Sequence, residues 1–163
     1  MRLIIIRHAI AVPRGTPDVP DDERTLTRRG RQRFRSAAAG LARLVKRPDF
    51  VLSSPLPRAR ETADIAAREW GKRVEVTEEA ALAGGTVEEI SKMLEGYPGD
   101  STVAIVGHEP DLSELLARVL GTPHERRLTF KKGGAAMVEL SGSALDGGGL
   151  IWYLPPRLLR EAR

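Results

Sequence analysis

The chain has 163 residues, of which 41% are hydrophobic and 29% charged, a composition typical of one globular domain and not of a disordered segment. It contains no cysteine, which excludes disulfides, thiolate nucleophiles and cysteine-ligated zinc. The formal net charge of +4 favours anionic partners in general. Because the arginines are interleaved with helical periodicity and only 4% of residues are aromatic, we expect no nucleic-acid binding.

No apolar stretch of the sequence is long enough to span a membrane, and the first one is too short for a signal peptide. We therefore expect a cytoplasmic protein with no membrane partner. Neither an internal repeat nor a linker interrupts the chain, so residues 1–163 are predicted to form a single domain.

The first predicted strand ends in two functional side chains. Leu3–Ile6 is an apolar, β-branched run, typical of a strand buried on both faces. Arg7 and His8 follow it directly. In open α/β sheets, ligands bind outside the carboxyl ends of the strands, so this end is a candidate ligand site. The alternative is that Arg7 and His8 only begin a solvated loop, and the other strand ends decide between the two.

The next segments alternate between helix and strand. Ile10–Asp22 is rich in proline and glycine and is predicted to be a loop over the strand edge. Thr27 is the expected cap of a helix over residues 28–45. Residues 49–52 form a second apolar strand, which leads through two serines and a proline into a helix over residues 59–70.

The middle of the chain repeats this alternation. We predict a third strand at residues 72–76 and a loop over residues 78–85. Thr86 and Glu89 have the spacing of a capping box for a helix that runs to about Glu95. The clearest later strand, Thr102–Val106, is followed by Gly107-His108.

The last third of the chain is predicted to contain one helix, two or three strands and a short terminal segment. The expected elements are a helix capped by Asp111 through Leu120, strands near Phe130, at 136–140 and at 150–154, a glycine-rich hairpin over 141–149, and a short helix or frayed tail at 157–163. The whole pattern predicts an α/β fold, a three-layer α/β/α sandwich whose mostly parallel sheet has antiparallel strands at one edge.

In such a sheet, three strand ends would deliver their side chains to one edge. These are Arg7 with His8, Arg58 after the second strand, and His108 after the fourth. Two imidazoles and two guanidiniums with no carboxylate among them repel one another unless an anion lies between them. Phosphate fits best, because guanidinium groups bind its oxygens bidentately, so a phosphate-like or sulfate-like anion is the expected occupant.

A phosphate pocket that contains a neutral histidine can do covalent chemistry. When one ring nitrogen is held by a hydrogen bond, the other can attack phosphorus and form a phosphohistidine, which water then hydrolyses. Arg7, Arg58 and His108 would stabilise the charge on the phosphoryl oxygens. The scheme needs no metal, and Arg7 and Arg58 would repel a cation, so no metal is expected.

Taken together, these motifs resemble those of the histidine phosphatase superfamily, and within it the small SixA-type branch of phosphohistidine phosphatases. The matching segments are Arg7-His8-Ala9, Leu26-Thr27-Arg28-Arg29-Gly30, Ser53-Ser54-Pro55 with Arg58-Ala59 and Glu61-Thr62, Gly107-His108, and the tail Trp152-Tyr153-Leu154-Pro155-Pro156. The resemblance extends from Met1 to about Pro156 and leaves no room for the cap insertions of larger members.

The resemblance implies that His8 is the nucleophile, that Arg7, Arg58 and His108 form the phosphate pocket, and that no cofactor is required. The sequence departs from the family by having Arg-His-Ala in place of the usual Arg-His-Gly. Larger members place a proton donor in the loop after the third strand, where this chain offers Glu79 as the candidate general acid. A phosphoramidate substrate would depend less on such an acid, because a protonated imidazole leaves more readily than an alkoxide.

Five other residues have weaker expected roles. Arg24 is a candidate either for contact with the rim of the pocket or for an ion pair with a nearby acidic residue. Glu109 is expected to cap the helix that follows it, with contact to substrate as the alternative, and Ser53 and Ser54 are expected to fix their turn by hydrogen bonds. His124 is expected to be a solvated side chain.

Three functions fit these residues. The first is a protein phosphohistidine phosphatase whose partner is a phosphorylated histidine-carrier protein. The second is a phosphomonoesterase that acts on a small phosphorylated molecule. The third is a module that binds phosphate or a phosphoprotein without turnover. An intact His8 favours the two enzymes over the third.

Overall fold

The computed structural model describes residues 1–71, 74–123 and 125–162. Within these residues, six strands form one sheet in the order β3-β2-β4-β1-β5-β6. The strands are β1 (Arg2–Arg7), β2 (Phe50–Ser53), β3 (Val76–Glu78), β4 (Thr102–Gly107), β5 (Ala135–Leu140) and β6 (Gly148–Leu154). The first four in chain order are parallel, whereas β5 is antiparallel to β1, and β6 to β5. The predicted sheet type is confirmed.

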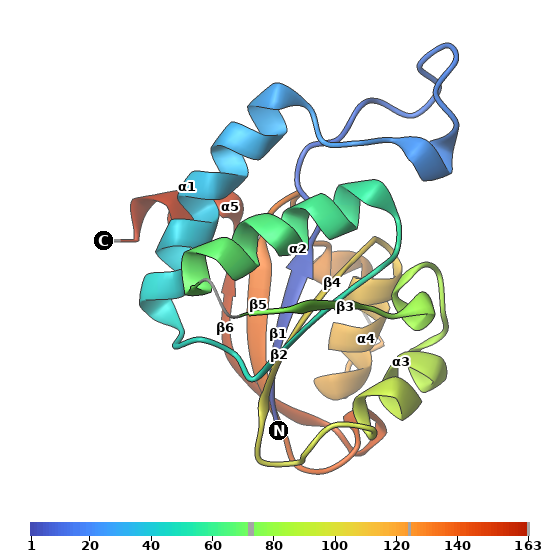
Figure 1. The fold of residues 1–163 in the computed structure, drawn as a ribbon. Helices are drawn as coiled ribbons and strands as arrows, with labels where there is room; N and C mark the ends of the chain where they lie inside the picture. Colours follow the sequence, from blue (N-terminus) through green and yellow to red (C-terminus); the bar gives the residue numbers. More distant parts are fainter. Residues whose placement is uncertain (72–73, 124, 163) are drawn as a thin grey trace.

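Helices cover both faces of this sheet (Figure 1). The helices are α1 (Arg28–Leu44), α2 (Pro57–Trp70), α3 (Val87–Leu94), α4 (Asp111–Val119) and α5 (Pro156–Glu161). The side chains of α1, α2 and α5 share one apolar cluster, and those of α3 and α4 share the other. The predicted three-layer α/β/α sandwich is therefore confirmed.

Strand β1 lies inside the sheet, between β4 and β5. Because side chains alternate along a strand, Ile4 and Ile6 pack in the cluster of α1 and α2, while Leu3 and Ile5 pack in the cluster of α3 and α4. All four are fully buried. An apolar run without alternation is what a strand covered on both faces requires, and it fixes the position of the residues that follow.

Two glycines allow α1 to pack closely against its neighbours. A Cβ on Gly30 would lie 2.0 Å from the Ile10 carbonyl oxygen, and one on Gly40 would lie 1.8 Å from that of Leu159. Gly30 also donates its N–H to the Thr27 hydroxyl at 2.9 Å, which confirms Thr27 as the cap. The first turn of α1 therefore lies directly against the segment that follows β1.

Two expected elements of the middle of the chain have different bounds. The predicted strand at residues 72–76 partly lies outside the described residues, and β3 begins at Val76. Its pairing with β2, which joins Ser53 to Glu78, extends it into the segment expected to be a loop. The capping box of Thr86 and Glu89 is confirmed at the start of α3.

Differences also occur later in the chain. Asp111 is the first residue of α4, and Pro110 occupies the cap position without a side-chain hydrogen bond, so the predicted Asp111 cap is wrong. Phe130 lies outside the strands and packs its ring 4.9 Å from that of Tyr153. The glycine-rich hairpin is confirmed and contains a short 3-10 turn, and the terminal helix is confirmed as α5. His124, predicted to be solvated, lies outside the described residues.

Candidate active site

His8 lies at the carboxyl end of β1, and its side chain is 5% exposed. Its backbone N–H donates to the Gly107 carbonyl at 3.0 Å, which continues the pairing of β1 with β4. The ring Nδ1 lies 2.8 Å from the Ala9 carbonyl oxygen. Because a carbonyl can only accept, Nδ1 carries the proton and Nε2 keeps a free lone pair.

The surroundings of His8 keep its ring neutral. Burial lowers its pKa to about 3, and the charges of His108, Arg58 and Arg7 act in the same direction, against the hydrogen bond to Ala9. At neutral pH the ring is therefore uncharged. An uncharged imidazole with a free Nε2 is the form that can attack phosphorus.

His108 follows β4 and faces His8, with ring centroids 5.1 Å apart and ring planes at 51°. Its Nε2 lies 2.8 Å from the Ser54 hydroxyl, which also accepts the Leu56 N–H at 3.2 Å. When the Ser54 hydroxyl donates its proton to Nε2, the proton of His108 sits on Nδ1. That buried Nδ1 has no hydrogen-bond partner among the described residues. Burial, followed by the charges of Arg58, Arg24 and Arg7, lowers the pKa of His108 to about 4.

Arg7 and Arg58 bring positive charge to the two histidines. An Arg7 Nη1–H donates to the Phe130 carbonyl, and Arg58 Nη1 donates to the Asp21 carbonyl at 2.8 Å. Burial is the largest cause that lowers the pKa of each guanidinium, and the charge of each lowers the pKa of both histidines. In the described part of the chain, the Nε atoms of both arginines are buried without a partner.

All three residues predicted to form the phosphate pocket, Arg7, Arg58 and His108, thus carry a buried nitrogen without a partner among the described residues that can donate a hydrogen bond. Such donors are costly to leave unsatisfied, and buried polar groups in proteins are almost always paired. A phosphoryl group offers three acceptor oxygens and the negative charge that this cluster lacks. The chemistry of the donor set therefore fits an oxyanion.

A chain of hydrogen bonds joins the His8 segment to the first turn of α2. The Ala9 N–H donates to the Thr62 hydroxyl at 3.0 Å, and that hydroxyl donates to the Arg58 carbonyl at 2.7 Å. Thr62 is fully buried. The Glu61-Thr62 motif by itself predicts no role for Thr62. In the structure, Thr62 holds the segment after His8 and the first turn of α2 in register.

The loop between β1 and α1 contributes a second charged layer. Arg24 is 6% exposed, donates to the Val12 carbonyl at 2.9 Å and contacts the Asp21 carboxylate at 3.0 Å. Its charge lowers the pKa of His108 and Arg58, so it lies near the pocket, and its rim contact with substrate stays a prediction. Asp21 also pairs with Arg14 at 2.7 Å and Arg58 at 3.5 Å. Sequence reasoning missed Asp21, because an acidic residue in a proline-rich loop carries no specific signal.

The two glutamates after the third strand have partners of their own. Glu79 accepts a hydrogen bond from the Tyr97 hydroxyl at 2.8 Å, and Glu78 pairs with Arg60 at the same distance. Burial and this hydrogen bond raise the pKa of Tyr97 to about 12. The structure thus does not bring Glu79 to the histidines by any of these contacts, and its role as general acid stays a prediction.

The prediction that Glu109 caps α4 is wrong. The Glu109 side chain is half-buried and turned toward the segment before β5. Its carboxylate accepts hydrogen bonds from the Ser113 hydroxyl at 2.6 Å and from the Phe130 N–H at 3.0 Å. That segment is the one whose carbonyl holds Arg7. Ser53 and Ser54 fix their turn as predicted. The Ser53 hydroxyl donates to the Ser54 carbonyl, and the Ser54 hydroxyl accepts the Leu56 N–H.

The described residues offer neither a group of metal-ligating side chains nor a helix suited to cross a membrane. No three His, Asp or Glu side chains among them are grouped as ligands of a metal ion would be. In the same residues, no helix combines the length and apolar character needed to cross a membrane.

Comparison with known proteins agrees with this geometry. The sequence profile of the histidine phosphatase superfamily (branch 1) matches residues 3–86. An uncharacterized protein from Picosynechococcus sp. is 35% identical over 137 residues, which are 82% of each chain.

Solved structures share the fold over nearly the full chain. The protein histidine phosphatase SixA, complexed with tungstate, has a TM-score of 0.81 and 25% identity, covering 98% of this chain and 99% of its own. The α-ribazole phosphatase from Shigella flexneri has a TM-score of 0.75 and 19% identity, covering 96% and 97%, and shows the fold alone. The chain therefore belongs to the histidine phosphatase superfamily and is a phosphatase.

Proposed function

We propose that this protein removes the phosphoryl group from phosphohistidine on a carrier protein, with His8 as the nucleophile. The observation that supports this most is the state of His8, which is buried, held at Nδ1 by the Ala9 carbonyl and free at Nε2. The similarity to a protein histidine phosphatase over nearly the full chain supports the substrate class.

In the first step, the lone pair of His8 Nε2 attacks phosphorus and forms a new N–P bond. The bond from phosphorus to the substrate's imidazole nitrogen breaks, and its electron pair stays on that imidazole. Arg7, Arg58 and the Nδ1–H of His108 donate hydrogen bonds to the phosphoryl oxygens. For phosphoryl transfer, such electrostatic stabilisation and positioning supply most of the rate enhancement.

In the second step, a water oxygen attacks the phosphorus of phospho-His8. The N–P bond breaks, its electron pair returns to Nε2, and inorganic phosphate carries away the water oxygen and its protons. Both steps leave the residues in their starting state. Neither step routes a proton through Glu79, whose described hydrogen bond is to Tyr97.

The leaving group explains why a proton donor is dispensable here. A phosphohistidine ring that carries a proton leaves as a neutral imidazole, whereas an ester leaves as an alkoxide and needs an acid. A substrate of this kind would give the protein a role in signal transduction and a cytoplasmic location, and both stay predictions.

A small phosphomonoester is the second candidate substrate. The observation that favours it is the fold, which is shared with an α-ribazole phosphatase at a TM-score of 0.75. The same His8 chemistry would apply, with Glu79 or water as the proton source. A module that binds without turnover is disfavoured by the free Nε2 of His8.

The test is to trap the phosphoenzyme. The protein is mixed with a ³²P-labelled phosphohistidine carrier domain, quenched within milliseconds and tested for stability of the label in acid and alkali. We expect an acid-labile, alkali-stable label on the wild type and none on His8→Ala. Turnover of a phosphomonoester panel without turnover of the carrier would refute the substrate and keep the phosphatase. Loss of activity on chelation would refute the metal-independent scheme.

A further inference from the structure

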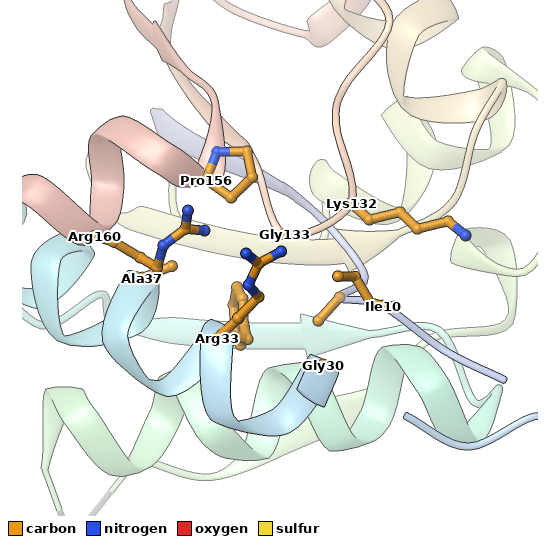
Figure 2. A pocket seen from close by; sticks show the side chains of 10 residues that line it. Ile10, Gly30, Arg33, Ala37, Lys132, Gly133, Pro156 and Arg160 are labelled. Carbon is orange, nitrogen blue, oxygen red and sulfur yellow. The ribbon is translucent and has the colours of Figure 1, made fainter. Parts of the chain in front are cut away.

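A small groove lies between helices α1 and α5, next to the segment that carries His8 (Figure 2). It encloses about 60 Å³, enough for a carboxylate or a few water molecules. Phe34 and Pro156 contribute apolar lining, and Arg33, Arg160 and Lys132 contribute positive charge. We call the cavity that these residues line the α1–α5 groove.

The groove shares a wall with the candidate active site. The Gly133 N–H, which lines the groove, donates to the carbonyl oxygens of both Arg7 and His8 at 3.1 Å. Burial lowers the pKa of Lys132, and the nearby positive charges of Arg7, Arg24 and Arg58 lower it further. A ligand in the groove would therefore lie beside a phosphoryl group on His8.

The three cations of the groove have no hydrogen bond or ion pair with any described residue. Figure 2 shows the guanidinium groups of Arg33 and Arg160 directed from their two helices toward the same opening. Two residues before Arg33, Arg31 pairs instead with Glu61 at 2.6 Å. Two guanidinium groups at one opening without a counter-ion favour an anionic ligand, and guanidinium groups match carboxylates in geometry. The Lys132 side chain extends away from both of them (Figure 2).

We infer that the α1–α5 groove binds an acidic side chain of the protein that presents the phosphohistidine. This inference rests on the proposed function, because it names a second contact with the same carrier protein. A protein partner is favoured over a small molecule because the positive surface extends along α1 to Arg29, four residues before Arg33 on the same helical face. A ligand filling about 60 Å³ would not reach that far.

The experiment compares the double variant Arg33→Glu/Arg160→Glu with the wild type on two substrates. One is a phosphorylated histidine-carrier domain, and the other is p-nitrophenyl phosphate, which has no second anionic group. Arg68→Glu is the matched control, because Arg68 is exposed on α2 and has no ion pair among the described residues. Arg33→Gln/Arg160→Gln repeats the test with less change in charge, and circular dichroism checks that each variant is folded.

We expect the double reversal to lower kcat/KM on the carrier domain by roughly tenfold more than on the ester, mainly through KM. The salt dependence of KM for the carrier should weaken in the same variant, while Arg68→Glu should resemble the wild type. An equal loss on both substrates would overturn the inference, and so would a loss no larger than that of Arg68→Glu.

Two further outcomes separate this inference from the proposed function. If the wild type hydrolyses the carrier and the double variant is equally active on it, the groove inference is wrong and the proposed function stands. If the wild type hydrolyses esters and no phosphohistidine protein, both are wrong. A selective loss on 3-phosphoglycerate, which carries a carboxylate, with the carrier unaffected, would assign the groove to a small molecule and overturn a protein partner.

Discussion

The ends of the central strands differ from the end of the edge strand β3. Strands β1 and β4 lead into two buried histidines whose partners are a carbonyl and a hydroxyl, so neither histidine pairs with a carboxylate of the described residues. Strand β3 ends at Glu78, and Glu79 follows it. Glu78 pairs with Arg60, and Glu79 accepts a hydrogen bond from Tyr97. The carboxylates of Glu78 and Glu79 therefore have partners other than the histidines.

This difference shows how the pocket stays positive. The carboxylate that pairs with Arg58 is Asp21, and it is shared among Arg14, Arg24 and Arg58, while the charge of Glu109 acts on Arg7. One negative charge against three guanidiniums leaves an excess of positive charge for an oxyanion. A site arranged in this way stabilises phosphoryl transfer more readily than it protonates a leaving group.

Removing charge from the central edge should have the largest effect. We expect Arg58→Ala to lower kcat/KM by about 10²–10³, because in the proposed mechanism Arg58 donates hydrogen bonds to the phosphoryl oxygens in the transition state. Arg60→Ala, two residues along α2, is the matched control, since the Arg60 guanidinium pairs with Asp64 and Glu78. Steady-state kinetics on one substrate would check both. A loss under tenfold for Arg58→Ala would remove it from the pocket.

Acid should destabilise the central edge. Both histidines have folded-state pKa values, about 3 and about 4, below the ordinary 6.5. Between those values and pH 6.5 the unfolded chain binds more protons than the folded one, so the free energy of unfolding falls as pH falls. The slope from the two histidines approaches about 2.7 kcal/mol per pH unit, because each proton contributes about 1.4.

Urea unfolding in phosphate-free buffer from pH 6.5 to 5 would measure this slope above the titration of most carboxylates. His108→Gln should halve it, because only His8 then titrates in the folded protein with a lowered pKa. An unfolding free energy that does not change across this range would contradict the burial of neutral histidines.

A smaller effect is expected from the hydrogen bond that holds His108. Ser54→Ala removes the hydroxyl that lies 2.8 Å from His108 Nε2, so the ring loses the bond that places its proton on Nδ1. We expect kcat to fall by about tenfold, the scale of one neutral hydrogen bond. Nitrogen NMR of His108 should show a mixture of tautomers. Ser53→Ala is the control, since its hydroxyl bonds to the Ser54 carbonyl and not to the ring.

Much of the fold could be predicted because its signals are local. The apolar runs at Leu3–Ile6 and Thr102–Val106 predict strands buried on both faces, and both lie in the middle of the sheet. Strand β3 could not be placed well, because it is short and half-exposed, and its bounds depend on pairing with β2. Its register is a property of the sheet and not of its own residues.

The same difference between local and long-range signals decides which parts of the candidate site could be predicted. That His8 and His108 come together could be predicted, because parallel strands share an edge, and the rings lie 5.1 Å apart. Lys132 and Asp21 could not be predicted, because loops bring them there through distant contacts. The Gly133 N–H, for example, bonds the Arg7 carbonyl across 126 positions of sequence, and no local pattern encodes such a bond.

The smallest effect should come from the end of β3. We expect Glu79→Gln to change kcat/KM on a phosphohistidine carrier by less than about twofold, because the leaving imidazole needs no acid and the carboxylate is bonded to Tyr97. Tyr97→Phe is the matched control, since it frees the carboxylate without removing it. A phosphomonoester assayed in parallel makes the comparison sharp. If Glu79→Gln lowers ester hydrolysis by more than tenfold and leaves the carrier unaffected, Glu79 protonates alkoxides, and the edge strand supplies the acid that the central strands lack.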